Sequence, residues 1–174
     1  MTFEELVRSF ETHTGLSGEV DNAQLAIWMN EAQLDLSLVM GNVAAHTFTE
    51  DELTDGGYRL PADCLKLVDS TADYTQLPDG RLQFTSSGGA TVYYRKNAAP
   101  FTGVDLSQIS ELPEPCHYLL PMWAASRYWD MESEGDGEES THGTKWMNYY
   151  LQGKANLLRY MDLSSVKLDA WRVI

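Results

Sequence analysis

Histidine and cysteine are the residue types in this chain that could hold a metal ion or act as nucleophiles. The four histidines, His13, His46, His117 and His142, share no i, i+4 spacing, and only His117 adjoins a cysteine. Cys116 and His117 are neighbours, so on a helix they would point in different directions and could not easily chelate one ion. We therefore favour a structural role for His117. The sequence also lacks a nucleophile elbow, a phosphate-binding loop and a dinucleotide fingerprint.

The acidic segment 132–140 is the other place where spacing could indicate chemistry. Its first, third and fifth residues are acidic and its sixth is Gly137, as at the start of an EF-hand calcium loop. The twelfth position should be a bidentate glutamate, but it is Gly143. We interpret the segment as a solvated loop. A second acidic cluster at 50–55 has no companion acid in an apolar pocket and is interpreted as a solvated turn, so no enzyme, cofactor or metal site is predicted.

Composition limits the class of protein. The chain has 174 residues, of which 43% are apolar and 11% aromatic, so one compact domain with a buried core is expected. No apolar run approaches the length of a membrane span, and no secretory signal is visible. Cys64 and Cys116 are far apart and are interpreted as buried thiols in a reducing cytosol, with a disulfide as the alternative. The net charge of −14 argues against tight binding to nucleic acid, which needs clustered Lys and Arg.

The pattern of apolar residues predicts helices on both sides of a β-rich segment. A capping box of Thr2 and Glu5 begins the first helix, and Gly15 ends it. A second helix is expected from Asp21 to Gly41, and the two should pack as a hairpin. From 43 to 96, Gly-containing turns separate four to six short strands, and 81–84 and 90–96 should form a β-hairpin. A helix should cover one face of this small sheet.

Helical spacing returns after residues 112–115, Leu-Pro-Glu-Pro. Pro121 either kinks this helix or lies in its first turn, and together with the preceding turn it is expected to set the angle between the two parts of the chain. A last helix should run from about Thr141 to Met161 despite Gly153. The alternating, uncapped tail predicts an extended arm. Trp171 is its candidate anchor on a partner, because an aromatic residue there has little local core to join.

The predicted fold class is thus α+β, mainly α: an antiparallel helical bundle with an inserted small antiparallel β subdomain and an extended C-terminal arm. The whole chain, 1–174, is expected to be one domain. Its parts are a helical hairpin at 1–42, a β-rich insertion at 43–112, a helical pair at 113–161 and an arm at 162–174.

Six short signals occur in a characteristic order between about residues 21 and 161. They are Trp28-Met29-Asn30-Glu31-Ala32-Gln33, Leu60-Pro61-Ala62-Asp63, Tyr93-Tyr94, Leu112-Pro113, His117-Tyr118 and Ala125-Ser126-Arg127-Tyr128. This order resembles tailed-phage head-to-tail adaptor (head completion) proteins, as does the Gly-containing acidic segment before the last helix. The start of that helix, Thr141 to Thr144, departs from the alanine usual in the family.

The resemblance implies a structural protein without catalysis or cofactors. Such adaptors form rings, commonly twelvefold, beneath the portal in the virion neck after synthesis in the host cytoplasm. They extend the DNA channel without binding DNA specifically, contact no membrane, and offer a surface to tail or neck proteins. By analogy the portal-contacting residues would be Lys167, Leu168, Trp171, Arg172, Val173 and Ile174. The acidic loop facing the lumen or the tail would comprise Glu132, Glu134, Asp136, Glu138 and Glu139.

Two other classes of protein fit parts of the sequence. A small acidic cytosolic binding module or a tail-assembly chaperone would share the acidity and the aromatic content without forming a ring. An enzyme with a carboxylate site in the β-rich segment would need convergent carboxylates in a pocket, which the spacing does not predict.

Overall fold

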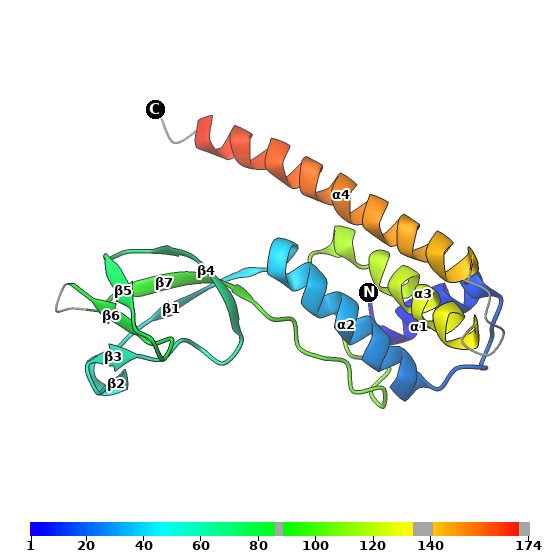
Figure 1. Ribbon diagram of the computed structural model, residues 1–174, viewed down its shortest axis with the longest axis horizontal. Helices are drawn as coiled ribbons and strands as arrows, with labels where there is room; N and C mark the ends of the chain where they lie inside the picture. Colours follow the sequence, from blue (N-terminus) through cyan, green and yellow to red (C-terminus); the bar gives the residue numbers. More distant parts are fainter. Residues whose placement is uncertain (86–88, 134–140, 171–174) are drawn as a thin grey trace.

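The computed structural model describes residues 1–85, 89–133 and 141–170 (Figure 1). Among these residues it has four α-helices and two antiparallel sheets. The helices are α1 (Phe3–Thr14), α2 (Asn22–Met40), α3 (Leu119–Ser133) and α4 (Thr141–Ala170), with short 3-10 turns at Glu50–Glu52 and Glu114–Cys116. The strands are β1 (Val43–Thr47), β2 (Leu53–Thr54), β3 (Gly57–Tyr58), β4 (Cys64–Ser70), β5 (Tyr74–Gln76), β6 (Leu82–Phe84) and β7 (Thr91–Lys96).

The starts and ends of the first two helices follow the predicted signals. In the capping box of α1, the Thr2 hydroxyl accepts from the Glu5 N–H and the Glu5 carboxylate accepts from the Thr2 N–H. Gly15 ends α1 with a φ of 77°, which favours glycine. The Asp21 carboxylate caps α2 by accepting from the Ala23 N–H. Local sequence chemistry therefore determines where these helices begin and end.

The predicted antiparallel bundle with an inserted subdomain is wrong. Helix α3 lies at the centre of the helical part and packs against α1, α2 and α4, whereas α1 and α2 both pack on α3 rather than forming a hairpin with each other. Helices make up about half of the chain, so the fold is α+β but not mainly α. The apolar stripes of α1 and α2 predicted a buried face correctly, but a stripe does not specify which helix covers it.

The extended C-terminal arm is also wrong over the described residues. Helix α4 continues to Ala170, and its last turns extend past the other helices (Figure 1). The sequence from 154 to 174 contains neither Gly nor Pro, so no residue there interrupts a helix that begins at Thr141. Pro121 lies in the first turn of α3, where a proline lacks only an N–H that has no partner within the helix.

The β-rich part has its own core between two sheets, and over the described residues no helix packs against that core. One sheet has the strand order β1-β7-β4 and the other β2-β3-β6-β5. Phe48, Leu82, Val92 and Tyr94 form the buried centre. The predicted hairpin of β6 and β7 is wrong, because β6 pairs with β3 and β5 whereas β7 pairs with β1 and β4. The alternation in this strand predicts that Val92 and Tyr94 share one face and Tyr93 and Arg95 the other, and Val92 and Tyr94 are both buried. Alternation does not identify the strand that pairs with β7.

The segment 97–112 leaves the sheets and packs on the helical part, although the sequence placed it in the β-rich insertion. Ala98, Phe101 and Leu112 belong to the helical core. The side chain of Asn30 on α2 binds both backbone groups of Phe101: its amide donates to the carbonyl at 2.9 Å and its oxygen accepts from the N–H at 2.8 Å. Because these bonds connect α2 directly to the segment that follows the sheets, they help to orient the two parts of the molecule.

Gln33 extends the attachment made by Asn30. Its amide donates to the Asn30 side-chain oxygen at 3.0 Å and to the carbonyl of Ala99 at 3.3 Å, and its own oxygen accepts from the Ser110 hydroxyl at 3.1 Å. Gln33 is only 1% exposed. A buried amide with several partners contributes to stability, whereas the same group without them would be costly. We refer to Asn30, Gln33 and Ser110, with the backbone groups that they bind, as the amide network.

The two crossings between the helical and β-rich parts lie side by side. Gly41 leads into β1, and its carbonyl accepts from the Arg95 guanidinium at 2.8 Å. A Cβ at Gly41 would lie 2.5 Å from the Ser37 carbonyl oxygen and 3.0 Å from that of Lys96, so the close approach of the two crossings requires glycine. The Glu111 carboxylate accepts from the Ala99 N–H and pairs with Lys96, and these contacts lower the pKa of Glu111. The junction is therefore held by contacts on both crossing segments, and no kink at Pro121 is needed to set its angle.

His117 has the structural role expected from its sequence context. Its Nε2–H donates to the carbonyl of Leu112 at 2.8 Å, and its Nδ1 accepts from the Met1 amino group at 2.9 Å. These partners define the tautomer, because a carbonyl only accepts and an ammonium group only donates. Burial lowers the pKa of His117. Cys116, next to it, is a free buried thiol, as Cys64 is a free, half-buried one, and burial raises the pKa of Cys116 to about 11.

Replacing Asn30 tests whether the amide network joins the two parts. Asn30→Ala leaves the Phe101 N–H and carbonyl without their partner, so we expect the free energy of unfolding to fall by about 2–3 kcal/mol. Gln24→Ala, on the same helix but outside the network, is the matched control and should change stability by less than about 0.5 kcal/mol. Urea denaturation followed by circular dichroism measures both variants, and equal losses would show that the network has no special role.

The lowered pKa of His117 predicts a pH dependence of stability. Because the folded state disfavours the imidazolium, the stabilisation from neutral His117 is present above its unfolded pKa of about 6.5 and is lost as pH falls through the lower folded value. We expect the melting temperature to fall as the pH is lowered below about 6.5. His117→Gln should be less stable at pH 7 but should show a smaller change over this range. An unchanged pH dependence in His117→Gln would contradict the assignment.

Candidate subunit interface

The outer face of α2 carries an apolar stripe that nothing in the described chain covers. Ile27, Leu34 and Leu38 are 54%, 45% and 42% exposed. Their spacing of seven and four residues places them along one side of the helix. The opposite side of α2 is buried against the helical core, so this helix is apolar on both sides. Such a helix is expected to be enclosed by protein. We call Ile27, Leu34 and Leu38 the α2 stripe.

The two charged residues of α2 point to neighbouring helices of the same chain. The Glu31 carboxylate accepts from the Trp123 indole N–H at 3.1 Å and from the Arg127 guanidinium at 3.0 Å, both on α3. Arg127 also lies over the Trp123 ring, 4.9 Å from its centre. These contacts bring charge to one margin of the stripe, and the three stripe residues themselves remain apolar.

Asp35, the second charge of α2, attaches α4. Its carboxylate accepts from the hydroxyl of Tyr150 and from the Lys154 ammonium at 2.5 Å. Tyr150 is fully buried, and this burial, followed by the bond to Asp35, raises its pKa. Gly153 lies between these two α4 residues, where a Cβ would come within 2.5 Å of the Leu119 side chain. Glycine thus permits a close crossing that determines the direction in which α4 leaves the helical part.

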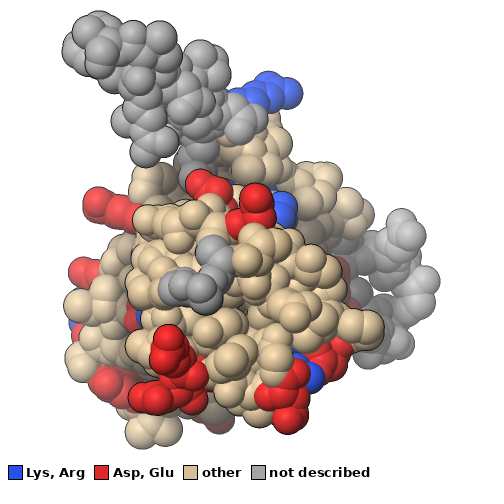
Figure 2. Space-filling model, turned by 90° about the vertical axis from the view of Figure 1, so that its left-hand side faces the viewer, with Lys and Arg blue, Asp and Glu red and all other residues tan. Residues whose placement is uncertain are grey.

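Beyond this crossing, α4 carries exposed aromatic and basic side chains. Tyr160 is 69% exposed, and Arg159 beside it is exposed as well. Residues 141–161 contain Lys145, Lys154 and Arg159 but no Asp or Glu, although the chain as a whole has a net charge of −14. Figure 2, seen from the β-rich end, shows acidic side chains spread over that face and few basic ones. The first two thirds of α4 are therefore basic on an acidic protein, whereas residues 162–170 carry Asp162 and Asp169 beside Lys167.

The predicted partner-binding residues lie on or next to this helix. Lys167 and Leu168 belong to the last turns of α4, so the segment there is helical and not extended. Trp171, Arg172, Val173 and Ile174 lie outside the described residues. Glu132 is exposed near the end of α3, whereas Glu134, Asp136, Glu138 and Glu139 lie outside the described residues. Their proposed roles in partner binding therefore stay predictions.

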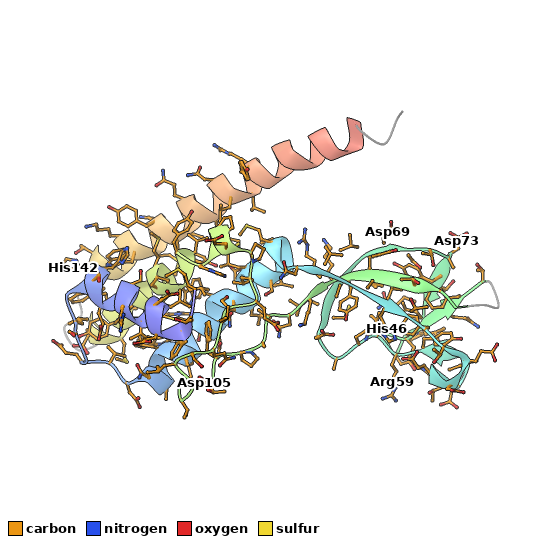
Figure 3. The ribbon with its side chains drawn as sticks, turned by 180° about the vertical axis from the view of Figure 1, so that it is seen from behind. His46, Arg59, Asp69, Asp73, Asp105 and His142 are labelled. Atoms are coloured by element: carbon orange, nitrogen blue, oxygen red, sulfur yellow. The ribbon has the colours of Figure 1, made fainter. Side chains whose placement is uncertain are left out.

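The titratable residues that could support chemistry are dispersed over the described parts of the chain. His46 lies in the β-rich part and His142 at the start of α4, at opposite ends of the molecule (Figure 3). The Nε2 atom of His46 lies 2.9 Å from the Glu52 carboxylate, with which it forms a hydrogen bond. Within residues 1–85, 89–133 and 141–170, no three His, Cys, Asp or Glu side chains lie close enough to hold a metal ion.

Comparison with known proteins identifies no family: no protein-family model and no curated protein matches this chain. None of the helices, over the residues described, is both long and apolar enough to cross a membrane. The α2 stripe and the projecting helix α4 are the observations from which we argue a function.

Sequence analysis did not identify the α2 stripe. The spacing of apolar residues predicts an inward face made of Leu25, Trp28, Met29, Ala32, Leu36 and Val39. The first five are buried, and Val39 is half-buried against the core. The available signal was the small number of charges on the opposite face, because Ile27, Leu34 and Leu38 occupy positions where a solvent-facing helix usually carries polar residues.

The bond between Asp35 and Tyr150 gives a prediction about the attachment of α4. Asp35→Ala leaves the buried Tyr150 hydroxyl without an acceptor, so we expect a loss of about 2 kcal/mol in the free energy of unfolding. The half-exposed ion pair with Lys154 should add little to that loss. Asp73→Ala, at an exposed site in the β-rich part, is the control. Tryptophan fluorescence during denaturation, which reports on Trp123 beside Tyr150, measures the effect. An unchanged Asp35→Ala midpoint would contradict this account.

Proposed function

We propose that this chain is a structural adaptor of a tailed phage that assembles into a ring under the portal, extends the DNA channel and offers a surface for tail attachment. The observation that carries the proposal is the uncovered α2 stripe on a chain that also projects the long helix α4. Large apolar side chains that share one exposed helix face mark a surface for protein association. A protein that must bind copies of itself, a portal and a tail protein needs several such surfaces.

The positions of the adaptor-like signals support this proposal. Trp28 and Met29 are buried in the helical core, whereas Asn30 and Gln33 from the same segment form the amide network. Asp63, from the second signal, accepts from the Tyr94 hydroxyl at 3.1 Å, which links it to the Tyr-Tyr strand. The signals thus lie in the helical core, within the β-rich part and in the bonds of α2 to the segment that follows the sheets, and a shared order of such contacts is a reason to expect a shared architecture.

The charge of the chain agrees with a channel through which DNA passes. A net charge of −14 on each subunit, repeated around a ring, would repel the phosphate backbone and let DNA move without adhering to the wall. By the same analogy the ring is twelvefold and lies in the virion neck after synthesis in the host cytoplasm. The C-terminal residues Lys167, Leu168 and Trp171 to Ile174 contact the portal, and the acidic segment at 132–139 faces the lumen or the tail.

Electron microscopy of the purified chain with its portal protein tests the proposal. We expect closed rings, of one subunit number, stacked on the portal with a central opening. Deleting residues 167–174 should leave circular dichroism and ring formation unchanged but abolish portal binding, because the deletion removes Trp171 and its neighbours without reaching the described contacts of α4 in the helical part.

Two results would contradict the proposal in different ways. A chain that stays monomeric with and without the portal would favour the alternative, a small acidic binding module or tail-assembly chaperone without ring formation. Rings that still bind the portal after the deletion would leave ring formation intact and contradict the role of residues 167–174 in portal binding. Trp171→Ala is the finer variant: as a hot spot it should weaken portal binding by about 2 kcal/mol without lowering the melting temperature.

A further inference from the structure

We infer that a groove beside α1 of one copy receives the exposed face of α4 from a second copy, in a head-to-tail contact repeated around the ring. This inference rests on the ring-forming function proposed above and names two surfaces that would form the ring. Four features of the molecule support it: the build of the groove, the side chains of the α4 face, the charges of both surfaces and their placement around α1.

The groove lies between α1, the connection from α1 to α2 and segment 97–112, and has a volume of about 390 Å³. Each of these three segments contributes one apolar side chain to its lining: Val7, Val20 and Leu106. The first two are half-buried against the helical core, and the third is 37% exposed. Together with the acidic residues that also line it, Glu4, Glu11 and Asp21, we call these residues the α1 groove.

Hydrogen bonds within the chain hold the walls of the α1 groove in place. The Leu106 carbonyl accepts from the Glu4 N–H at 2.9 Å, which attaches segment 97–112 to the start of α1. The Glu11 carboxylate accepts from the Gly18 N–H at 2.9 Å, which attaches the connection to the end of α1. A surface whose walls are already ordered loses little conformational entropy when a partner binds. The groove is therefore prepared for a partner before the partner arrives.

The exposed side of α4 carries a row of aromatic, amide and basic side chains. Its members recur at intervals of three or four residues and so lie along one side of the helix: Lys145, Tyr149, Gln152, Asn156 and Tyr160. All five are exposed, Tyr149 at 44% and Tyr160 at 69%. We call them the α4 face. Tyrosine is enriched at protein interfaces, because its ring is apolar and its hydroxyl can form hydrogen bonds.

The charges of the two surfaces are complementary. Lys145 and the neighbouring Arg159 make the α4 face basic, and residues 141–161 contain no Asp or Glu, although 26 of the 174 residues of the chain are acidic. Residues 1–21 contain five acidic residues and one basic residue, Arg8, which is paired with Glu4 at 2.6 Å. Two copies of this chain therefore attract each other when the α4 face of one approaches the α1 groove of the other.

The two surfaces lie on different sides of α1, so they cannot meet within one chain. His13 of α1 contacts Trp146 of α4, with ring centres 5.4 Å apart, which places α4 against the side of α1 that carries His13. Glu11 in the groove is two residues earlier and lies about 160° from His13 around the helix axis. An interface between two different surfaces of the same chain is heterologous, and its repetition forms a closed ring when the rotation closes.

Charge reversal on either surface tests this contact. The double variant Lys145→Glu, Arg159→Glu makes the α4 face acidic and leaves the α1 groove unchanged. The double variant Glu4→Lys, Leu106→Lys makes the groove basic and leaves the α4 face unchanged. All four side chains are exposed, so the circular dichroism spectrum should be unchanged and the melting temperatures should stay close to that of the unsubstituted chain.

Each reversed variant has a control with the same change in net charge in the β-rich part. Arg59→Glu, Lys66→Glu matches the α4 variant, and Val68→Lys, Asp73→Lys matches the groove variant. These four side chains are exposed as well. The controls therefore separate a contact at the two named surfaces from a general effect of net charge on association.

We expect each reversed variant alone to self-associate at least about tenfold more weakly than the unsubstituted chain, because like charges then oppose each other at every contact. Both controls should assemble as the unsubstituted chain does. An equimolar mixture of the two reversed variants should associate again, because the basic groove meets the acidic face and the unchanged groove meets the unchanged face. Sedimentation velocity measures each sample. If assembly occurs only on the portal, electron microscopy with the portal gives the same comparison.

The outcomes separate this contact from the proposed function. Undiminished assembly of either reversed variant, equal losses in a reversed variant and its control, or a mixture that does not associate would overturn the contact between the α4 face and the α1 groove. Rings of the unsubstituted chain would in each of these cases preserve the proposed function. If the unsubstituted chain forms no ring, alone or on the portal, both the function and this contact are overturned.

Discussion

The attachment of segment 97–112 to α2 by the amide network is the contact on which the rest of the structure depends. The chain leaves the helical part at Gly41, forms two sheets with their own core, and returns at Lys96. The Gly41–Arg95 bond and the contacts of Glu111 hold the two crossings together, and the amide network attaches the segment after the return to the helical core. Asn30 and Gln33 bind the backbone of the returning segment, and the buried amide groups allow one arrangement because any other leaves them unpaired. The orientation of the β-rich part thus follows from α2.

Helix α2 also determines the direction in which α4 leaves the helical part. On one side α2 anchors the returning segment, and through Asp35 it fixes the crossing of α4 beside Gly153. The remaining side is the α2 stripe. One helix therefore orients the β-rich part, orients the projecting helix and presents an apolar surface. In a ring this arrangement would transmit the position of a neighbouring subunit to both ends of the molecule through a single rigid element.

The sequence predicted local features well and their assembly poorly. The capping box of α1, the caps of α2 and the buried face of β7 depend on residues within a few positions of each other, and the structure confirms them. The predicted bundle, the hairpin of β6 and β7 and the extended arm were wrong. Each depends on contacts or strand pairings between elements that are distant in sequence, or on how far a helix continues. The α2 stripe was missed for a related reason: an exposed leucine and a buried one look alike in sequence unless the charges on the same helix are considered. The adaptor function, predicted from the order of short signals, stays a prediction.

The central proposal is that copies of this chain associate into a closed ring. Native mass spectrometry of the purified chain tests it most directly, because it counts subunits in each species. A closed ring predicts one dominant oligomer at a fixed integer multiple of the chain mass, with weakly populated shorter species. A heterologous contact also predicts that odd-numbered intermediates occur. A spectrum containing only monomers, or a dimer that never grows, would contradict the claim.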